Sequence, residues 1–278
     1  MRLARAVQWF AASRAATCYA GMAGAGFLSV LGVSAAVGQG LPRARPEEIG
    51  LSPRALERIG PALQAYVDSG KLAGMVAVIA RHGKVGYLQA IGHMDVERAV
   101  PMRADAVFRI YSMTKPIVAV AILKLAEEGK LRLDDPLTAL VPAFSGTMVY
   151  AGGPAAAPVL RAPARAITIE HLLTHTAGLS YGYYGETPVD SLYRGANLLE
   201  PTRTVAQFAD TVARLPLLFL PGDAWTYSLA SDVLGRVIEV ASGRPLDAYL
   251  DEVIFQPLGM RETSFHASPS VNDRIPVL

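Results

Sequence analysis

Two neighbouring strand-like runs, which lie between helical patterns, constrain the fold of this chain most. Residues 75–79 and 85–91 are rich in β-branched and apolar residues, and Arg81-His82-Gly83-Lys84 separates the two runs. Two β-rich runs joined by a short polar turn that contains glycine predict an antiparallel hairpin. Any fold for this chain must therefore place a sheet early in the sequence.

Helical spacing of apolar residues dominates on both sides of the hairpin. A helix is predicted from Leu51-Ser52-Pro53 to a stop at Gly70. The later helical patterns cover residues 112–129, 169–175, 205–217, 229–242 and 245–255. Residues 151–166, rich in Ala, Gly and Pro, predict an exposed loop, and no helix is predicted to begin within residues 181–188. A helix, then strands, then a block of helices indicates an α+β fold, with a sheet part at 41–111 and a mainly helical part at 112–263.

The first 40 residues have the order of a secretory signal peptide. Three arginines (Arg2, Arg5 and Arg14) and no acid precede an apolar stretch at 15–37 that ends in small residues. We expect an exported protein, periplasmic or secreted. The apolar stretch is long for a signal, so a membrane anchor at 15–37 is the alternative, and it is the only membrane contact expected.

Composition excludes several classes of function. The chain has 278 residues, of which 51% are hydrophobic, enough for a large core. Without the three leader arginines, 23 basic residues stand against 24 acidic ones, a net charge of −1, which gives no electrostatic basis for binding nucleic acid. The single cysteine, Cys18, lies in the leader, so we expect no disulfide or thiol chemistry in the mature part.

Ser112-Met113-Thr114-Lys115 carries the first sign of catalysis. The motif directly precedes an apolar helical run, and Pro116 is tolerated only in the first turn of a helix. Residues i and i+3 share a helix face, so the Lys115 amine can reach the Ser112 hydroxyl. A serine beside an amine is an activated nucleophile. A serine cap with an exposed lysine is the purely structural alternative.

The setting of this motif resembles a known family. The run F-R-I-Y-S-M-T-K-P-I-V-A-V-A-I-L-K-L, within residues 108–137, is similar to the first catalytic motif of the serine beta-lactamase-like hydrolases, which include class C beta-lactamases, D-Ala-D-Ala peptidases and related esterases. Residues 167–179, 221–228 and 257–265 resemble further segments of the family in the same order, so the resemblance covers most of residues 45–265. It implies a beta-lactamase-like fold, with an antiparallel sheet flanked by helices and a mainly helical subdomain. It also implies that Ser112 forms the acyl-enzyme.

The resemblance also implies roles for two other side chains. In Pro221-Gly222-Asp223-Ala224-Trp225-Thr226-Tyr227-Ser228, Tyr227 matches the tyrosine that the family directs at its serine and lysine. A phenol beside an ammonium ionises more easily, so Tyr227 is expected to take the serine's proton while Lys115 stays charged. A buried tyrosine that packs on the following helix is the alternative.

The sequence departs from the family at two points. Leu229 stands where an asparagine often assists amide binding, and this favours the esterases of the family over its lactamases. A late Gly-rich third motif, which supplies half of the oxyanion hole, has no counterpart before Leu278. We therefore expect the closing strands to be missing and residues 264–278 to be the start of the returning sheet part.

Three other patterns suggest a pocket, a second nucleophile and a metal site. Tyr181 and Tyr183, with Leu229, are candidates for the substrate pocket, although an aromatic loop packed on its own core is equally compatible with the sequence. Gly178-Leu179-Ser180-Tyr181-Gly182 fits a nucleophile elbow but lacks the strand and helix that an elbow requires. His171 and His175 have metal-ligand spacing, but Leu172 replaces the glutamate of a zinc protease, so we expect no metal.

These observations lead to one main hypothesis and two alternatives. The main one is a serine hydrolase, most simply a carboxylesterase, that acts on a small-molecule ester or amide through Ser112, Lys115 and Tyr227 without metal or organic cofactor. A beta-lactamase or D-Ala-D-Ala carboxypeptidase with the same residues is the first alternative. The second is a non-catalytic binding or scaffold protein, or an inactive fragment.

Overall fold

The computed structural model describes residues 40–277. The predicted leader, apart from its last residue, lies outside this range and stays a prediction. Within the described range, no helix has the length and apolar character that a membrane span requires.

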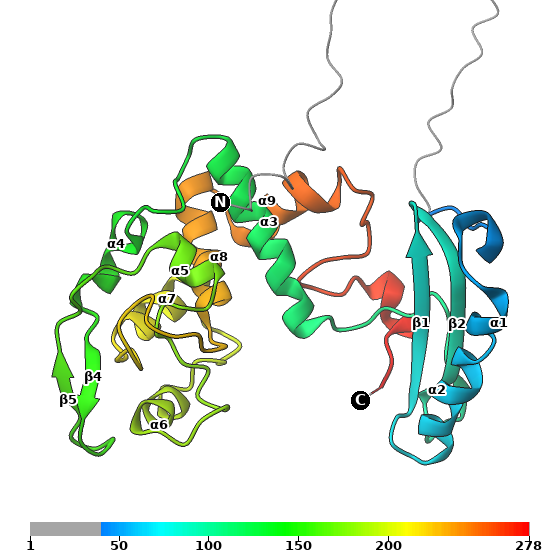
Figure 1. Ribbon diagram of the computed structural model, residues 1–278, viewed down its shortest axis with the longest axis horizontal. Coiled ribbons are helices and arrows are strands. Elements are labelled where there is room, and N and C mark those ends of the chain that lie inside the picture. The colour runs from blue at the N-terminus through cyan, green and yellow to red at the C-terminus, as the bar shows by residue number, and fades with distance from the viewer. Residues whose placement is uncertain (1–39, 278) are drawn as a thin grey trace, which may run out of the picture. The chain divides into compact units, whose positions relative to one another are not determined.

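The predicted hairpin forms the sheet part (Figure 1). β1 (Gly74–Arg81) pairs antiparallel with β2 (Lys84–Asp95), and β3 (Val100–Pro101) adds a short third strand at β2. The turn residues His82 and Gly83 have φ values of 51° and 69°. Positive φ at both central residues gives the turn a twist that matches that of the strands.

Two helices accompany this sheet. α1 (Pro53–Leu56) begins after Ser52, whose hydroxyl accepts a hydrogen bond from the Ala55 N–H, and α2 (Ile59–Asp68) ends just before Gly70. α2 packs against β2, as Figure 1 shows. The predicted helix 51–70 is therefore present but divided in two.

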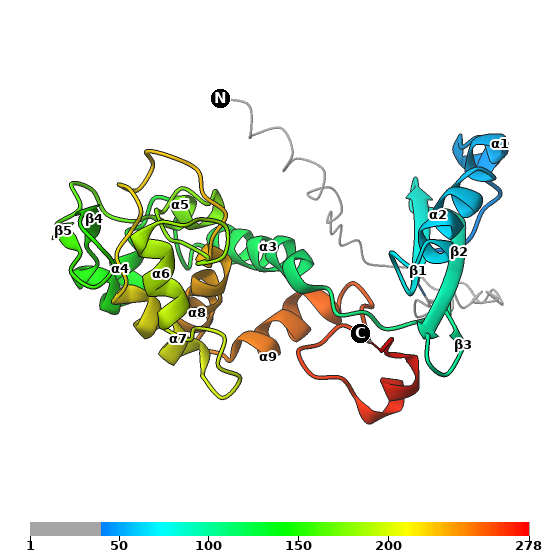
Figure 2. The ribbon, with the colours of Figure 1, turned by 90° about the horizontal axis from the view of Figure 1, so that it is seen from below.

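The core of the helical part is built on α3 (Thr114–Glu127) and α8 (Ala230–Ser242), which pack against each other. Ala121, Ile122 and Leu125 of α3 are fully buried, and burial of one such leucine contributes about 1.5–3 kcal/mol. The surrounding helices are α4 (Leu137–Leu140), α5 (Ile169–Leu173), α6 (Pro188–Gly195), α7 (Val205–Ala213) and α9 (Leu246–Leu250), with a π-helical turn at Asp251–Phe255 (Figure 2).

Two sequence-based expectations were wrong in this part. Residues 151–166 are not simply a loop, because β4 (Val149–Gly152) and β5 (Val159–Arg161) form a hairpin. The unexpected helix α6 begins at Pro188, where Thr187 and Asp190 form a reciprocal capping box. The hairpin depends on partners outside the segment, since the Tyr150 N–H bonds the Leu217 carbonyl.

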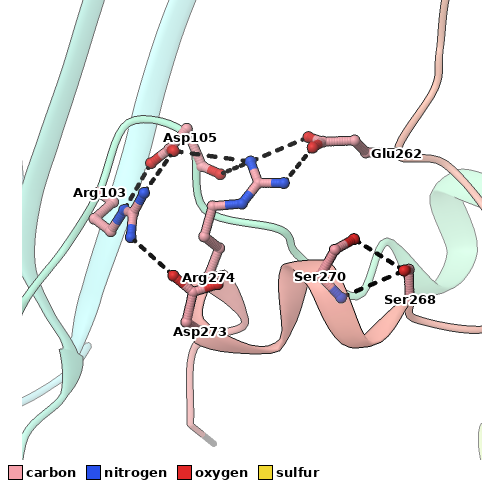
Figure 3. A network of polar contacts seen from close by, with 7 residues as sticks. All are labelled: Arg103, Asp105, Glu262, Ser268, Ser270, Asp273 and Arg274. Carbon is pink, nitrogen blue, oxygen red and sulfur yellow. Dashed lines mark hydrogen bonds and ion pairs between the residues drawn. The ribbon is translucent and has the colours of Figure 1, made fainter.

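The last described residues, 264–277, form a 3-10 helix at Pro269–Arg274 and no strand. Their return towards the sheet part is marked by two backbone bonds, from Val107 N–H to Arg274 O (2.8 Å) and from Val277 N–H to Met94 O (2.9 Å). Figure 3 shows the ion-pair network beside them, in which Asp105 accepts from Arg103 and Arg274 pairs with Glu262. These contacts join the segment before Ser112 to residues 262–274.

Candidate active site

Ser112 lies in a 3-10 turn, Tyr111–Met113, directly before α3. The α-helix itself begins at Thr114, so Ser112 precedes the helix rather than starting it, and Pro116 falls in the first turn. Lys115 Nζ lies 3.4 Å from Ser112 Oγ, at hydrogen-bond distance. Tyr111 has a φ of 42°, a left-handed value that is costly for a non-glycine residue and is found most often at functional sites.

Tyr227 completes a cluster of three polar side chains. Its hydroxyl lies 2.8 Å from Ser112 Oγ, and Lys115 Nζ lies 4.8 Å from the centre of its ring. Ser112 is exposed while Lys115 and Tyr227 are partly buried. The structure thus brings together the three residues that the sequence analysis named as catalytic.

His175 holds the segment that carries Tyr227. Its Nδ1 lies 3.3 Å from the Ser228 N–H and 3.2 Å from Ser228 Oγ, and its carbonyl accepts the Thr226 N–H. Its ring is 5.0 Å from that of Tyr227. His171 instead caps α5, with Nδ1 accepting the Thr168 N–H. The described residues contain no group of three potential metal ligands, and both histidines have structural contacts.

An aromatic layer surrounds the Tyr227 ring. Tyr181 stacks on it at 5.7 Å with an interplanar angle of 7°, and Tyr184 meets it edge-on at 5.7 Å. The Lys115 ammonium lies 5.5 Å from the centre of the Tyr181 ring. Because a cation is attracted to aromatic faces, this layer holds Lys115 close to the two phenols.

The electrostatics separate the roles of Lys115 and Tyr227. Burial opposes ionisation of Tyr227, but the hydrogen bonds with Lys115 and Ser112 outweigh it, so the pKa of Tyr227 lies below its ordinary value. For Lys115, burial lowers the pKa, and contact with the Tyr227 hydroxyl together with the charges of Tyr181 and Asp232 raises it above its ordinary value. Lys115 therefore stays an ammonium, and Tyr227 is the group able to accept a proton.

The candidate pocket residues separate in the structure. Tyr181 lines the same cavity as Ser112 and Lys115, which has a volume of about 470 Å³. Tyr183 and Leu229 do not line this cavity; with Tyr181 they line a small adjoining pocket of about 40 Å³. Leu229 is only 2% exposed, so its side chain belongs to the core.

Three charged cavity residues, Glu200, Arg203 and Asp232, escaped the sequence analysis. Asp232, in the first turn of α8, and Arg203, just before α7, both line the main cavity. Burial raises the pKa of the Asp232 carboxyl, although Lys115 acts in the opposite direction. The sequence pattern that could have identified Asp232 is its position one to two helical turns after Tyr227, at the start of a predicted helix. No local pattern in the sequence indicates Arg203.

Ser180 has the environment of a structural residue. It is 2% exposed, and its hydroxyl donates to Asp190 and accepts the Gly182 N–H. No strand leads into it, and the next helix begins only at Pro188. The geometry of a nucleophile elbow is therefore absent here.

The fold is that of the beta-lactamase-like proteins, as predicted. The family model described as Beta-lactamase matches residues 61–275, and the chain belongs to this family. Esterase EstB of Burkholderia gladioli is 39% identical over 234 residues, which are 77% of this chain and 55% of the relative. Lovastatin esterase of Penicillium rubens is 32% identical over 207 residues, 73% of this chain and 51% of the relative.

Solved structures agree with this assignment. One, described as "EstCE1, a hydrolase with promiscuous acyltransferase activity", has a TM-score of 0.67 and 33% identity over 80% of this chain and 56% of its own. The chain thus spans about half the length of the curated relatives that it matches.

Proposed function

We propose that the protein is a serine hydrolase that cleaves carboxylic esters through an acyl-enzyme on Ser112. The observation that supports this most is the contact of Ser112 Oγ with both the Tyr227 hydroxyl, at 2.8 Å, and Lys115 Nζ, at 3.4 Å. The esterases among its relatives support the ester as the substrate class.

The reaction follows from the charges of these groups. The Tyr227 phenolate, stabilised by the Lys115 ammonium, takes the proton of Ser112 as Oγ bonds to the ester carbonyl carbon. The Ser112 N–H, ahead of α3, donates to the developing oxyanion. Tyr227 then returns the proton to the departing alkoxide, and the acyl group stays on Ser112. In the second half, a water oxygen bonds to the acyl carbon as water gives a proton to Tyr227. Tyr227 passes this proton to Ser112 Oγ as the bond between Oγ and the acyl carbon breaks, which releases the acid.

Esters are favoured over amide-like substrates for a physical reason. Leu229, the residue before α8, has no side-chain amide that could bind the amide group of a substrate. A polar contact of that kind contributes about 1 kcal/mol or more to binding. Beta-lactam or D-peptide hydrolysis with the same three residues is the rival that the experiment must address.

The test compares short-chain aryl esters with a chromogenic cephalosporin. We expect a higher kcat/KM for the esters, and loss of both activities in Ser112→Ala. A higher kcat/KM for the cephalosporin would assign the protein to the lactamase branch. Turnover that survives in Ser112→Ala would contradict the role of Ser112. No turnover of either substrate would contradict the proposal and favour a binding role.

We also propose that residues 1–40 direct export. Their basic and then apolar order supports this. Fractionation of cells that express the whole chain, with and without these residues, would find the protein outside the cytoplasm only when they are present.

A further inference from the structure

The cavity at Ser112 extends well beyond the catalytic residues. Its volume of about 470 Å³ lies within the usual range for small-molecule sites. Besides Ser112 and Lys115, much of the lining is apolar and comes from the segments around α7 and α9, including Leu198, Val205, Phe208, Leu246 and Phe265. An ester group at Ser112 would leave room for a longer substrate chain within this space.

Arg203 is the unusual member of this lining. It is partly buried, its Nη1 is fully buried, and Nη1 has no hydrogen-bond acceptor among the residues that the structure describes. A guanidinium keeps its proton under all ordinary conditions, so burial cannot neutralise it. The Arg203 side chain lines the cavity and makes no hydrogen bond or ion pair with a described residue, so an anionic ligand in the cavity would supply the acceptor that the guanidinium lacks.

The neighbouring carboxylates do not serve as that acceptor. Glu200, also in the lining, accepts from Asn197 Nδ2 at 3.2 Å and from Thr202 Oγ1 at 3.4 Å. Asp232 lies at the catalytic end, where its charge raises the pKa of Lys115 and of Tyr227. Among the described cations, only Lys115 shifts the pKa of Asp232. Neither carboxylate of the lining therefore accepts a hydrogen bond from Arg203.

We propose that Arg203 binds a carboxylate of the substrate, so that the preferred substrates are esters that also carry a free carboxylate. This inference rests on the proposed ester hydrolysis at Ser112. Arg203 presents paired N–H donors that match the two oxygens of a carboxylate. A carboxylate held by Arg203 leaves the ester of the same molecule free to lie at Ser112, which lines the same cavity.

The experiment uses ester pairs that differ only in charge. For a carboxylate in the acyl part, para-nitrophenyl hemiglutarate is compared with its neutral methyl ester. For a carboxylate in the alcohol part, para-carboxyphenyl butyrate is compared with its methyl ester. We expect the anionic member of at least one pair to have the higher kcat/KM, and the pair that shows this preference identifies the side of the ester that Arg203 reads.

Substitution at Arg203 tests the assignment. In Arg203→Met the ratio of anionic to neutral kcat/KM should fall about 10- to 100-fold, mainly through KM, because one charged hydrogen-bonded contact is lost. Arg203→Lys should keep part of the preference. Arg214→Met, which removes an exposed arginine at the other end of α7, should keep the whole ratio. A ratio near one in the unmodified chain, or a ratio unchanged in Arg203→Met, would overturn the proposal.

A binding measurement separates this inference from the catalytic one. In Ser112→Ala, monomethyl glutarate should raise the melting temperature and dimethyl glutarate should not; the shift should disappear in Ser112→Ala/Arg203→Met and persist in Ser112→Ala/Arg214→Met. Binding without any ester turnover would contradict the proposed hydrolysis alone. Turnover of neutral esters without this selective binding would contradict the role of Arg203 alone.

Discussion

The Tyr227 hydroxyl lies 2.8 Å from Ser112 Oγ, although 115 positions separate the two residues in the chain. Ser112 is placed by the turn before α3, and Tyr227 by the segment before α8, and these two helices pack against each other. His175 secures the second segment through Ser228. The packing of α3 against α8 therefore brings Ser112 and Tyr227 into contact.

We predict that the nucleophile is Ser112 and not Ser180. Ser112 is exposed beside Lys115, whereas Ser180 is buried against Asp190. A fluorophosphonate probe should label the peptide that contains Ser112, and the label should vanish in Ser112→Ala. Mass spectrometry of the labelled peptides measures this. Ser180→Ala should keep the label; its loss there, with label retained in Ser112→Ala, would make Ser180 the nucleophile.

The pH dependence of ester hydrolysis reports the state of Tyr227. In the proposed mechanism the active form has Tyr227 ionised and Lys115 protonated, so kcat/KM should rise with pH through the lowered pKa of Tyr227 and fall through the raised pKa of Lys115. Lys115→Met removes the stabilising ammonium and should move the acid limb to higher pH, with a lower rate. Asp232→Asn removes a negative charge and should move it to lower pH.

The opposite displacements of the acid limb in Lys115→Met and Asp232→Asn test whether this limb reports the ionisation of Tyr227. Each pKa unit of displacement changes the rate on the acid limb about tenfold. Displacement in the same direction for both variants would show that the limb belongs to another group.

His175 should make the stability of the fold depend on pH. Burial, and then the charge of Lys115, lowers the pKa of His175 in the folded state. The unfolded chain therefore binds more protons below pH ~6.5, so the contribution is present above that pH and is lost as the pH falls through the folded pKa. Thermal unfolding from pH 7.5 to 5 should show the loss.

The variant His175→Asn should weaken this pH dependence because it removes the titrating imidazole. Asparagine is chosen because it tolerates the φ of 56° at this position. A remainder from His171, whose pKa is also lowered, should persist. His266→Asn, at an exposed histidine, should retain the full slope. If the unmodified chain, His175→Asn and His266→Asn lost stability equally as the pH falls, the assignment to His175 would be refuted.

Asp190 should stabilise the loop that carries Tyr181. Its carboxylate is 4% exposed and accepts from Ser180, from the Thr187 N–H and from the Thr187 hydroxyl. Asp190→Ala leaves these donors unpaired and should lower the free energy of unfolding by about 2–3 kcal/mol in denaturant titration. Asp210→Ala, at an exposed position on α7, should change it by less than about 0.5 kcal/mol.

Local patterns in the sequence were sufficient for much of this fold. The hairpin of β1 and β2, and the helices α3 and α8, follow from the spacing of apolar residues and from turn residues, which act over a few positions. The approach of Lys115 to Ser112 follows in the same way from one helical turn. Even α6 had its signal, the Thr187 and Asp190 capping box, which the sequence analysis overlooked.

Packing over long distances decided the rest. The strands β4 and β5 depend on the backbone of Leu217, and the cavity acquires Arg203 and Asp232 from segments with no local motif in common. Leu229, which the sequence suggested as a pocket residue, is buried and lines only the small adjoining pocket, not the cavity at Ser112. The residue types and their periodicity thus determine the helices and the first hairpin, because those depend on near neighbours. The composition and charge of the site depend on which faces pack together, and only the tertiary structure specifies that.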